Sequence, residues 1–382
     1  MTDTMPVPID GAVEQPAGAG RPQSPARKEG WIALAEAEPR QEPARLDPGQ
    51  LTRLDEAARE VYDDARAAWH ANLGPLRTPA LARIHDDLWE LVDANRQDGD
   101  RVRGAAAIDA YPGLGKTTAA VSFAKAFHRR ERRLRGPETD GGHEHLPVCR
   151  VGLTSNTTMK GFNQALLQFY GHPARSRGSA AELAARALDC VLCCGTKLAV
   201  VDDIHFLDMT RRDGLEVANH LKWLANEFPV TFVFAGVGLE ERGLLSEGLS
   251  PLQAGYAQTA RRWTRMSIEP FEISTEAGRR EWRALLLAIE QRLILARLTP
   301  GAVADGLADY LYERSTGHIG SLMTLIARGT HRAVRRETET LTRELLDGIT
   351  IDHAAEQARS RAESARRARG PSRRGSGSRS TG

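Results

Sequence analysis

The feature that most constrains the fold is a glycine-rich turn at residues 110–118, which lies between an apolar run and an amphipathic stretch. The turn reads Ala-Tyr-Pro-Gly-Leu-Gly-Lys-Thr-Thr, and the run Ala-Ala-Ala-Ile-Asp precedes it. A strand that enters such a turn and leaves it as a helix is the structural context of a phosphate-binding loop. The sequence therefore predicts a nucleotide-binding α/β domain; the alternative is a chance Gly-Lys-Thr at a helix start.

Each residue type in this turn has a physical task. Gly113 and Gly115 let the backbone point its N–H groups inward, and the N-terminus of the following helix adds partial positive charge. Lys116 is expected to reach the β- and γ-phosphates of ATP, and the Thr117 hydroxyl to bind Mg²⁺. The strict pattern has Gly at its first position, where this chain has Ala110. The expected nucleotide-binding residues are Pro112, Gly113, Leu114, Gly115, Lys116, Thr117 and Thr118.

An acidic pair follows a second apolar run, Leu-Ala-Val-Val, at residues 198–201. A nucleotide site of this kind needs carboxylates at the end of a neighbouring strand, to hold the metal and polarise water. We expect Asp202 to bind Mg²⁺ through water, and Asp203 to act as a general base or to orient the attacking water. The alternative is a pair of aspartates that cap a helix after a buried strand.

The middle of the chain alternates short apolar runs with amphipathic stretches, which is typical of a parallel sheet covered by helices. Expected strands lie at 105–110, 148–153, 197–201, 230–235 and 266–268, with helices at 116–127, 161–170, 180–194 and 215–228. An exposed loop is expected at 129–146. After residue 270 the strand signals stop, and helical patterns follow at 276–297, 303–315, 319–336 and 342–359.

These patterns divide the chain into five expected segments. The first, at 1–45, is rich in Pro, Gly, Ala and Glu and is expected to be a disordered arm, because it has too little apolar surface to bury. An N-terminal helical segment at 46–100, a nucleotide-binding α/β core at 101–272, a smaller helical subdomain at 273–355 and an Arg-rich disordered tail at 356–382 follow.

The composition excludes several classes of protein. With 52 Lys plus Arg against 50 Asp plus Glu, the net charge of +2 gives no whole-chain argument for nucleic acid or membrane binding. No run of about 18 apolar residues and no secretory signal is present, so we expect a cytoplasmic protein without a membrane span. The cysteines fit a reducing compartment. A metal site at Cys190, Cys193 and Cys194 would need Cys149 or a histidine such as His143 or His145, so buried thiols are the alternative.

Taken together, the motifs resemble those of AAA+ ATPases, and within them the TniB group of transposition ATPases, related to TnsC, MuB and IstB. The resemblance covers residues 78–335 and rests on the turn at 109–117, on Asp-Asp-Ile-His-Phe-Leu at 202–207, and on Leu-Lys-x-Leu-x-Asn-Glu-Phe before the fourth expected strand. It implies an α/β fold of the P-loop NTPase (AAA+) type, with a parallel sheet, flanking helices and a smaller all-α lid subdomain.

The resemblance also implies an activity. A protein of this group would bind ATP and Mg²⁺, hydrolyse ATP, form a homo-oligomeric ring or filament on double-stranded DNA, and recruit or activate a DDE-type transposase at the target site. Such proteins complete the ATP site with an arginine from the neighbouring subunit. Arg262 matches that position, with Arg261 in reserve; the alternative is a surface Arg pair on a helix.

Two loops are expected to contact DNA. Related ATPases follow the DNA backbone with loops that line the ring or filament axis, and Thr157, Thr158 and Lys160 lie in the loop after the second strand. Arg211 and Arg212, after the acidic pair, form the second candidate. For both loops the alternative is a set of solvated residues that cap the next helix.

Two departures from the family pattern bear on turnover. The fourth strand ends in Ala-Gly-Val and offers no side-chain hydrogen bond for the attacking water, and the lid start at 317–321 has no arginine. His318 is either a substitute for that arginine or a helix-capping residue. Slow hydrolysis, or a nucleotide switch with little turnover, is therefore consistent with the sequence. A helicase-loader-type ATPase and a nucleotide-gated signalling switch directed at protein are the alternative functions.

Overall fold

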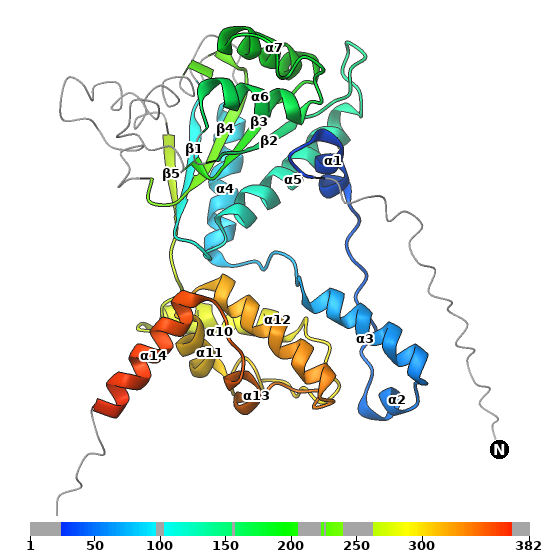
Figure 1. Ribbon diagram of the computed structural model, residues 1–382, viewed down its shortest axis with the longest axis vertical. Coiled ribbons are helices and arrows are strands. Elements are labelled where there is room, and N and C mark those ends of the chain that lie inside the picture. Colours follow the sequence, from blue (N-terminus) through cyan, green and yellow to red (C-terminus); the bar gives the residue numbers. More distant parts are fainter. Residues whose placement is uncertain are drawn as a thin grey trace, which may run out of the picture.

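The computed structural model describes residues 24–96, 103–154, 157–204, 223–224, 227–239 and 263–368. Within these residues five parallel strands form one sheet in the order β2-β3-β4-β1-β5 (Figure 1). The strands are β1 (Ala105–Ala110), β2 (Val148–Gly152), β3 (Leu198–Asp202), β4 (Thr231–Gly236) and β5 (Trp263–Ile268). Every residue of β1, β3 and β4 is buried, because helices cover both faces of a parallel sheet. The five expected strands are confirmed, with shifts of a few residues at their ends.

Helices flank this sheet. They are α4 (Pro79–Ala94), α5 (Lys116–Arg135), α6 (Met159–Phe169) and α7 (Ala180–Cys193). Helix α5 packs beneath the strands with α4 against it, and α6 and α7 pack together beside β2. The expected exposed loop at 129–146 is wrong over its first part, because α5 continues to Arg135 and ends at Gly136 with φ of 83°. Glu131 is buried in that extension and accepts a hydrogen bond from Lys197 at 2.9 Å.

The segment expected to be a disordered arm contains a packed helix, α1 (Lys28–Glu36). Trp31 is fully buried in the core of the sheet domain, and its indole N–H donates to His128 Nδ1 at 3.1 Å. Glu36 forms an ion pair with Arg132 at 3.0 Å. The expectation for 1–45 is therefore wrong for α1: a short helix becomes stable when α5 provides the surface that buries it. Residues 1–23 lie outside the described part of the chain.

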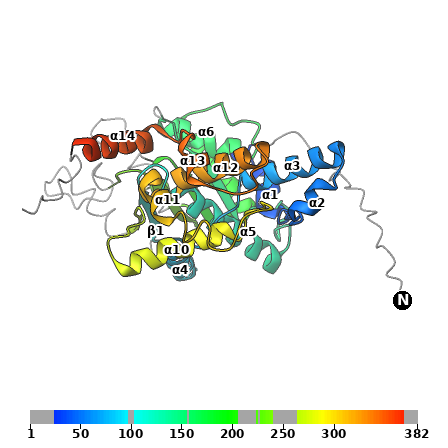
Figure 2. The ribbon, with the colours of Figure 1, turned by 90° about the horizontal axis from the view of Figure 1, so that it is seen from below.

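A second, helical subdomain follows β5. It comprises α10 (Glu276–Glu290), α11 (Ala308–Ser315), α12 (Ile319–Arg335), α13 (Arg343–Asp347) and α14 (His353–Ala368), and has its own apolar core. From below, α2 (Pro48–Thr52) and α3 (Glu56–His70) lie at one end of this lid, and α14 projects from the other (Figure 2). The expected tail at 356–382 is helical as far as Ala368; residues 369–382 are outside the described range.

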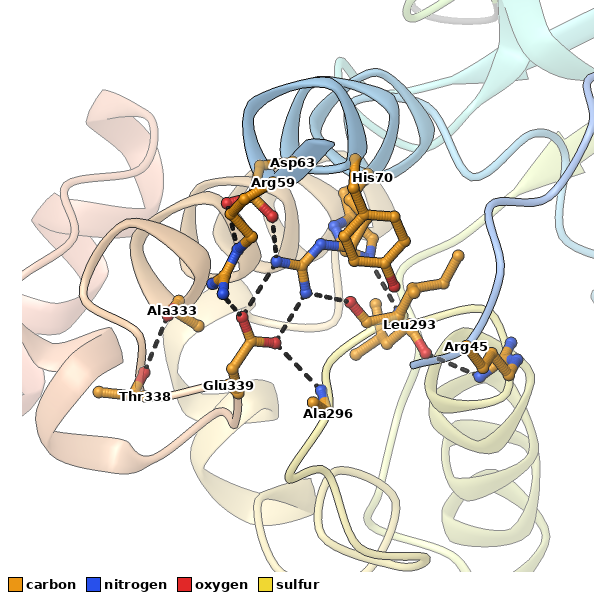
Figure 3. Close-up of polar contacts among 12 residues, drawn as sticks. Arg45, Arg59, Asp63, His70, Leu293, Ala296, Ala333, Thr338 and Glu339 are labelled. Carbon is orange, nitrogen blue, oxygen red and sulfur yellow. Dashed lines mark hydrogen bonds and ion pairs between the residues drawn. The ribbon is translucent and has the colours of Figure 1, made fainter. Parts of the chain in front are cut away.

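Over its described residues, the chain passes between the sheet domain and the lid three times. The linkers are residues 37–47, 71–78 and 269–275, because α1 and α4 pack on the sheet domain while α2 and α3 pack with the lid. Polar contacts hold α3 in place: Arg59 and Arg66 both contact Glu339, and His70 accepts from Ile294 N at 2.9 Å (Figure 3). None of the helices in the described ranges is long and apolar enough to cross a membrane.

Candidate nucleotide-binding site

The glycine-rich turn lies where the sequence predicts, between the end of β1 and the start of α5. Gly113 and Gly115 have φ of 79° and 94°, a backbone region that favours glycine, and buried Leu114 anchors the loop between them. No side chain caps the N-terminus of α5, which begins at Lys116. The first N–H groups of that helix therefore face the loop with their partial positive charge available to an anion.

The two expected metal-binding side chains are neighbours. The Thr117 hydroxyl donates to Asp202 Oδ1 at 3.3 Å, and Asp202 is 4% exposed at the carboxyl end of β3. Both offer oxygen atoms, which are the ligands that Mg²⁺ prefers. The donor set and its position beside the phosphate loop therefore fit a nucleotide-bound magnesium ion.

Asp203 follows at the same sheet edge in an unusual backbone conformation. Its φ is 59°, in the left-handed region, and its N–H donates to Asp202 Oδ1 at 3.1 Å. Aspartate tolerates this region better than most residues, and such conformations concentrate at functional sites. Asp202 thus lies beside Thr117, and Asp203 is half-buried at the strand end.

Arg150 of β2 is a site residue that the sequence analysis did not identify. Its Nη2 lies 3.3 Å from Asp202 Oδ2, and its buried Nε has no hydrogen-bond partner among the described residues. The signal was a single charge inside the apolar run Val-Cys-Arg-Val. The guanidinium offers Asp202 a positive charge that a metal ion would have to compete with.

Asp109 is a second residue that the sequence analysis left without a role. Its buried carboxylate accepts from the backbone N–H of Leu239, after β4, at 3.2 Å and from Arg265 of β5 at 3.1 Å. Fourth-strand residues 235–237 offer no side-chain hydrogen bond, as expected from their sequence. Through these two contacts, Asp109 connects the segment after β4 to β1 and β5.

A cleft of about 720 Å³ runs beside the phosphate loop. Most of its lining comes from the turn and first part of α5, from the linker between α3 and α4, and from the start of α12, with single residues from α1, β2 and β5. Among its lining residues are Asn72, Leu76, Thr78, Gly115, Lys116, Thr117, Thr118, Lys125, Arg150, Ile319, Gly320 and Met323. Expected phosphate, metal and lid positions therefore border one cleft.

The lid touches the phosphate loop directly. Gly320 N donates to the Gly113 carbonyl at 2.8 Å, and a Cβ at Gly320 would lie 2.9 Å from that oxygen. His318 precedes α12, does not cap it with its side chain, and has its Nδ1 3.1 Å from Thr316 Oγ1. The imidazole thus contacts Thr316, and it is backbone N–H groups of α12 that face the loop.

The structure describes only some of the residues that are expected to bind DNA. The Thr158 side chain caps α6 by accepting from Gly161 N at 3.1 Å, and the Thr157 hydroxyl bonds to Thr154, so both hydroxyls serve local structure. Lys160 is exposed. Arg211, Arg212, Arg261 and Arg262 lie outside the described residues.

The cysteines have no metal partners in the described part of the chain, where no group of three or more His, Cys, Asp or Glu residues could hold an ion. Cys149, Cys190, Cys193 and Cys194 are free thiols. Burial raises the pKa of Cys149 to about 12 and that of Cys190 to about 11. Both thiols are therefore protonated near neutral pH, which disfavours them as ligands.

Comparisons with known proteins agree with this architecture. A family model described as an AAA domain matches residues 100–245. The Orc1 protein of Aeropyrum pernix, solved in complex with DNA, aligns at 18% identity over 78% of this chain and 70% of that chain, with a TM-score of 0.54. Cdc6p of Pyrobaculum aerophilum aligns at 14% identity over 72% and 70%, with a TM-score of 0.48. No curated protein matches the sequence.

Domain III of the replication initiation protein DnaA from Thermotoga maritima is similar at 14% identity over 76% of this chain and 94% of that chain, with a TM-score of 0.41. At 18% identity, the similarity to Orc1 is evidence for the fold alone. The TM-scores of Cdc6p and DnaA are too low to add to that evidence. The parallel sheet, its flanking helices, the helical C-terminal region and the matched domain define an AAA+ P-loop NTPase fold. The expected fold class is thus confirmed.

Proposed function

We propose that the protein is an ATP-hydrolysing AAA+ ATPase that assembles on double-stranded DNA. The observation that carries the nucleotide part is that the glycine-rich turn and Thr117 line one cleft that the lid borders, while Thr117 donates to Asp202 and Asp203 follows Asp202 at the strand end. Carboxyl ends of parallel strands are where α/β folds place their ligands. The DNA part is supported by the resemblance to transposition ATPases.

The residues divide the work as follows. Backbone N–H groups of the turn and Lys116 bind the phosphates, while Thr117 and Asp202 hold Mg²⁺, which neutralises charge on the phosphate oxygens when bound. Asp203 orients the attacking water. Arg262 of a neighbouring subunit would approach the γ-phosphate, so full turnover requires assembly. Residues 235–237 at the end of β4 have no polar side chain for the attacking water, and the start of the lid has no arginine. The site therefore hydrolyses ATP slowly.

On DNA, the ATP-bound homo-oligomer, a ring or filament, would mark a target site for a DDE-type transposase, as the TniB resemblance implies. Lys160 is exposed and available to the DNA backbone, with Thr157, Thr158, Arg211 and Arg212 as the other proposed contacts. A second candidate is an ATPase of replication, such as a helicase loader, because the Orc1 protein with the similar fold was solved in complex with DNA.

Nucleotide binding is tested first. Lys116→Ala should abolish ATP binding, measured by titration calorimetry, because it removes a phosphate contact and no core group. Lys125→Ala is the matched control, since Lys125 is on the same helix and lines the same cleft away from the turn. Unchanged ATP affinity in Lys116→Ala, or equal losses in both variants, would contradict the assignment of the turn.

Assembly is tested with random-sequence double-stranded DNA without nucleotide, with ADP and with a non-hydrolysable ATP analogue, following particle size by light scattering at two salt concentrations. We expect large particles only when both DNA and the ATP analogue are present. These particles should dissociate as the salt concentration rises. Absence of DNA binding in all three states would reject the DNA-dependent function and favour a nucleotide switch directed at protein.

A further inference from the structure

A basic groove lies outside the nucleotide site, between α3 and the C-terminal half of α12. The groove has a volume of about 850 Å³, and its charged lining residues are Arg328, Arg332, Arg335 and Arg336, with His70 and His331 beside them. No aspartate or glutamate lines it. In a chain whose net charge is only +2, this is a local concentration of one sign. We call it the α12 groove.

The arginines of the α12 groove keep their charge uncompensated. Arg328 donates to the Thr350 carbonyl and Arg332 to the Leu345 carbonyl, which are neutral partners. Arg335 and Arg336 are exposed at the end of α12, and no described residue forms an ion pair or hydrogen bond with their guanidinium groups. The surface therefore offers charge-assisted hydrogen bonds to an anion.

A buried histidine on the same groove lacks a partner. His70 is 2% exposed, and its Nε2 accepts from Ile294 N at 2.9 Å, which leaves the ring proton on Nδ1. That Nδ1 has no hydrogen-bond partner among the described residues. An unpaired buried donor costs about 1–3 kcal/mol, so the site calls for an acceptor oxygen.

The spacing of the charges selects the kind of anion. Arg328 and Arg336 are separated by about 12 Å along the helix axis, at 1.5 Å per residue. One strand of DNA carries one phosphate per 3.4 Å of duplex axis, so a duplex lying along α12 has about three or four phosphates of one strand within that length. A single phosphate would leave most of the arginines without a partner. The groove therefore fits a polyanion.

The rest of the lining argues against a protein partner. Apart from its arginines and histidines, the groove presents alanines, a glycine, a threonine and one isoleucine, and no Phe, Tyr or Trp. Protein interfaces depend on aromatic or large apolar anchors, and single-stranded nucleic acid on aromatic stacking. Neither kind of contact is available here, whereas arginine forks suit the phosphates of a duplex.

We propose that the α12 groove binds the phosphate backbone of double-stranded DNA, as a contact on the lid additional to the loops of the sheet domain. The proposal rests on the proposed DNA-dependent function. Binding there is independent of base sequence, because phosphate contacts position a duplex without reading it. It would also couple DNA to the nucleotide site, since the other end of α12 donates from Gly320 to Gly113.

The test compares two double variants that lose the same charge. The groove variant is Arg335→Gln with Arg336→Gln; the control is Arg280→Gln with Arg283→Gln, exposed arginines on α10 of the same lid. Fluorescence anisotropy with a labelled random-sequence duplex and a non-hydrolysable ATP analogue gives the affinity over a salt series. Unchanged melting temperature and ATP affinity verify that both variants are folded.

Two lost phosphate contacts should lower the slope of log affinity against log salt by about 1.8, at about 0.9 for each contact, while the control keeps the wild-type slope. If wild type binds DNA and the groove variant binds equally well, the groove proposal is wrong and the proposed function stands. Equal losses in the control would show a general charge effect and reject the groove.

If wild type binds no DNA in any nucleotide state, the proposed function fails. In that case, binding of poly-glutamate that depends on Arg335 and Arg336 would identify the groove as a site for acidic protein segments, and its assignment to DNA would be wrong. Absence of binding to either polymer would remove the groove as a polyanion site altogether.

Discussion

Arg66 and Glu339 form a buried, two-pronged ion pair that joins α3 to the lid, on the side where Figure 3 labels Glu339. Arg66 Nη1 lies 2.7 Å from Oε2 and Nη2 lies 3.0 Å from Oε1, with Arg66 fully buried and Glu339 4% exposed. Glu339 also accepts from Ala296 N at 3.0 Å. The joint therefore holds two charges that water cannot reach, and each depends on the other.

Removing one charge of this pair should be costly. Glu339→Gln should lower the free energy of unfolding by about 3 kcal/mol, the lower end for a broken buried pair, because Asp63 remains as a partner of Arg66. Urea denaturation measures the change. Glu276→Gln, which breaks the exposed pair with Arg280, is the control and should cost less than about 1 kcal/mol. Equal effects would contradict the buried role.

The lowered pKa of His70 predicts a pH range over which the folded protein loses stability as the pH falls. Burial, with the nearby charges of Arg66 and Arg45, lowers the pKa of His70 from 6.5 to about 4. Between these values the unfolded chain binds a proton that the folded protein excludes, so stability should fall by about 3 kcal/mol as pH drops through the window. His70→Gln keeps an acceptor for Ile294 N and should remove that part of the loss. Unfolding curves at several pH values compare the two proteins; identical pH dependence would contradict the assignment.

Arg150 should compete with magnesium. Arg150→Met removes the guanidinium 3.3 Å from Asp202, so the Mg²⁺ concentration for half-maximal nucleotide binding should fall several-fold. Arg265→Met is the matched control, because it removes an arginine from a similar pair with Asp109 on another strand. An Mg²⁺ dependence that is unchanged or weakened in Arg150→Met would show that the two charges do not share a carboxylate.

Gly320 should tolerate no side chain in the present lid position. Gly320→Ala places a Cβ 2.9 Å from the Gly113 carbonyl oxygen, so it should lower stability by about 1–3 kcal/mol and shift ATP affinity as the lid moves off the loop. Gly161→Ala is the control, because its Cβ would meet only Thr158 Oγ1 at 3.5 Å inside a helix. Thermal melting should show the control unchanged or slightly more stable; equal destabilisation would contradict the contact.

Sequence alone predicted what local patterns encode. The strand before the glycine-rich turn and the strand before Asp202 are each defined by a few adjacent residues, and the structure places them as expected. The contact between Thr117 and Asp202 also followed, because parallel strands bring their carboxyl ends to one edge.

What escaped prediction depends on tertiary contacts. Trp31 is one aromatic residue in a Pro- and Gly-rich segment, and only the surface of α5 makes its burial possible. Arg150 looked like an interruption of an apolar strand until β3 placed Asp202 beside it. The four-arginine groove is visible on α12 alone as an i, i+4, i+7 and i+8 series, but α3 supplies His70 from far along the chain.

The three linkers between the sheet domain and the lid limit how the molecule can move. A lid on one linker could swing open about a single hinge, whereas a body tethered by residues 37–47, 71–78 and 269–275 keeps few rigid-body freedoms. Any displacement of the lid must therefore move all three linkers together, including the one along the cleft, and must alter the contact between Gly320 and Gly113.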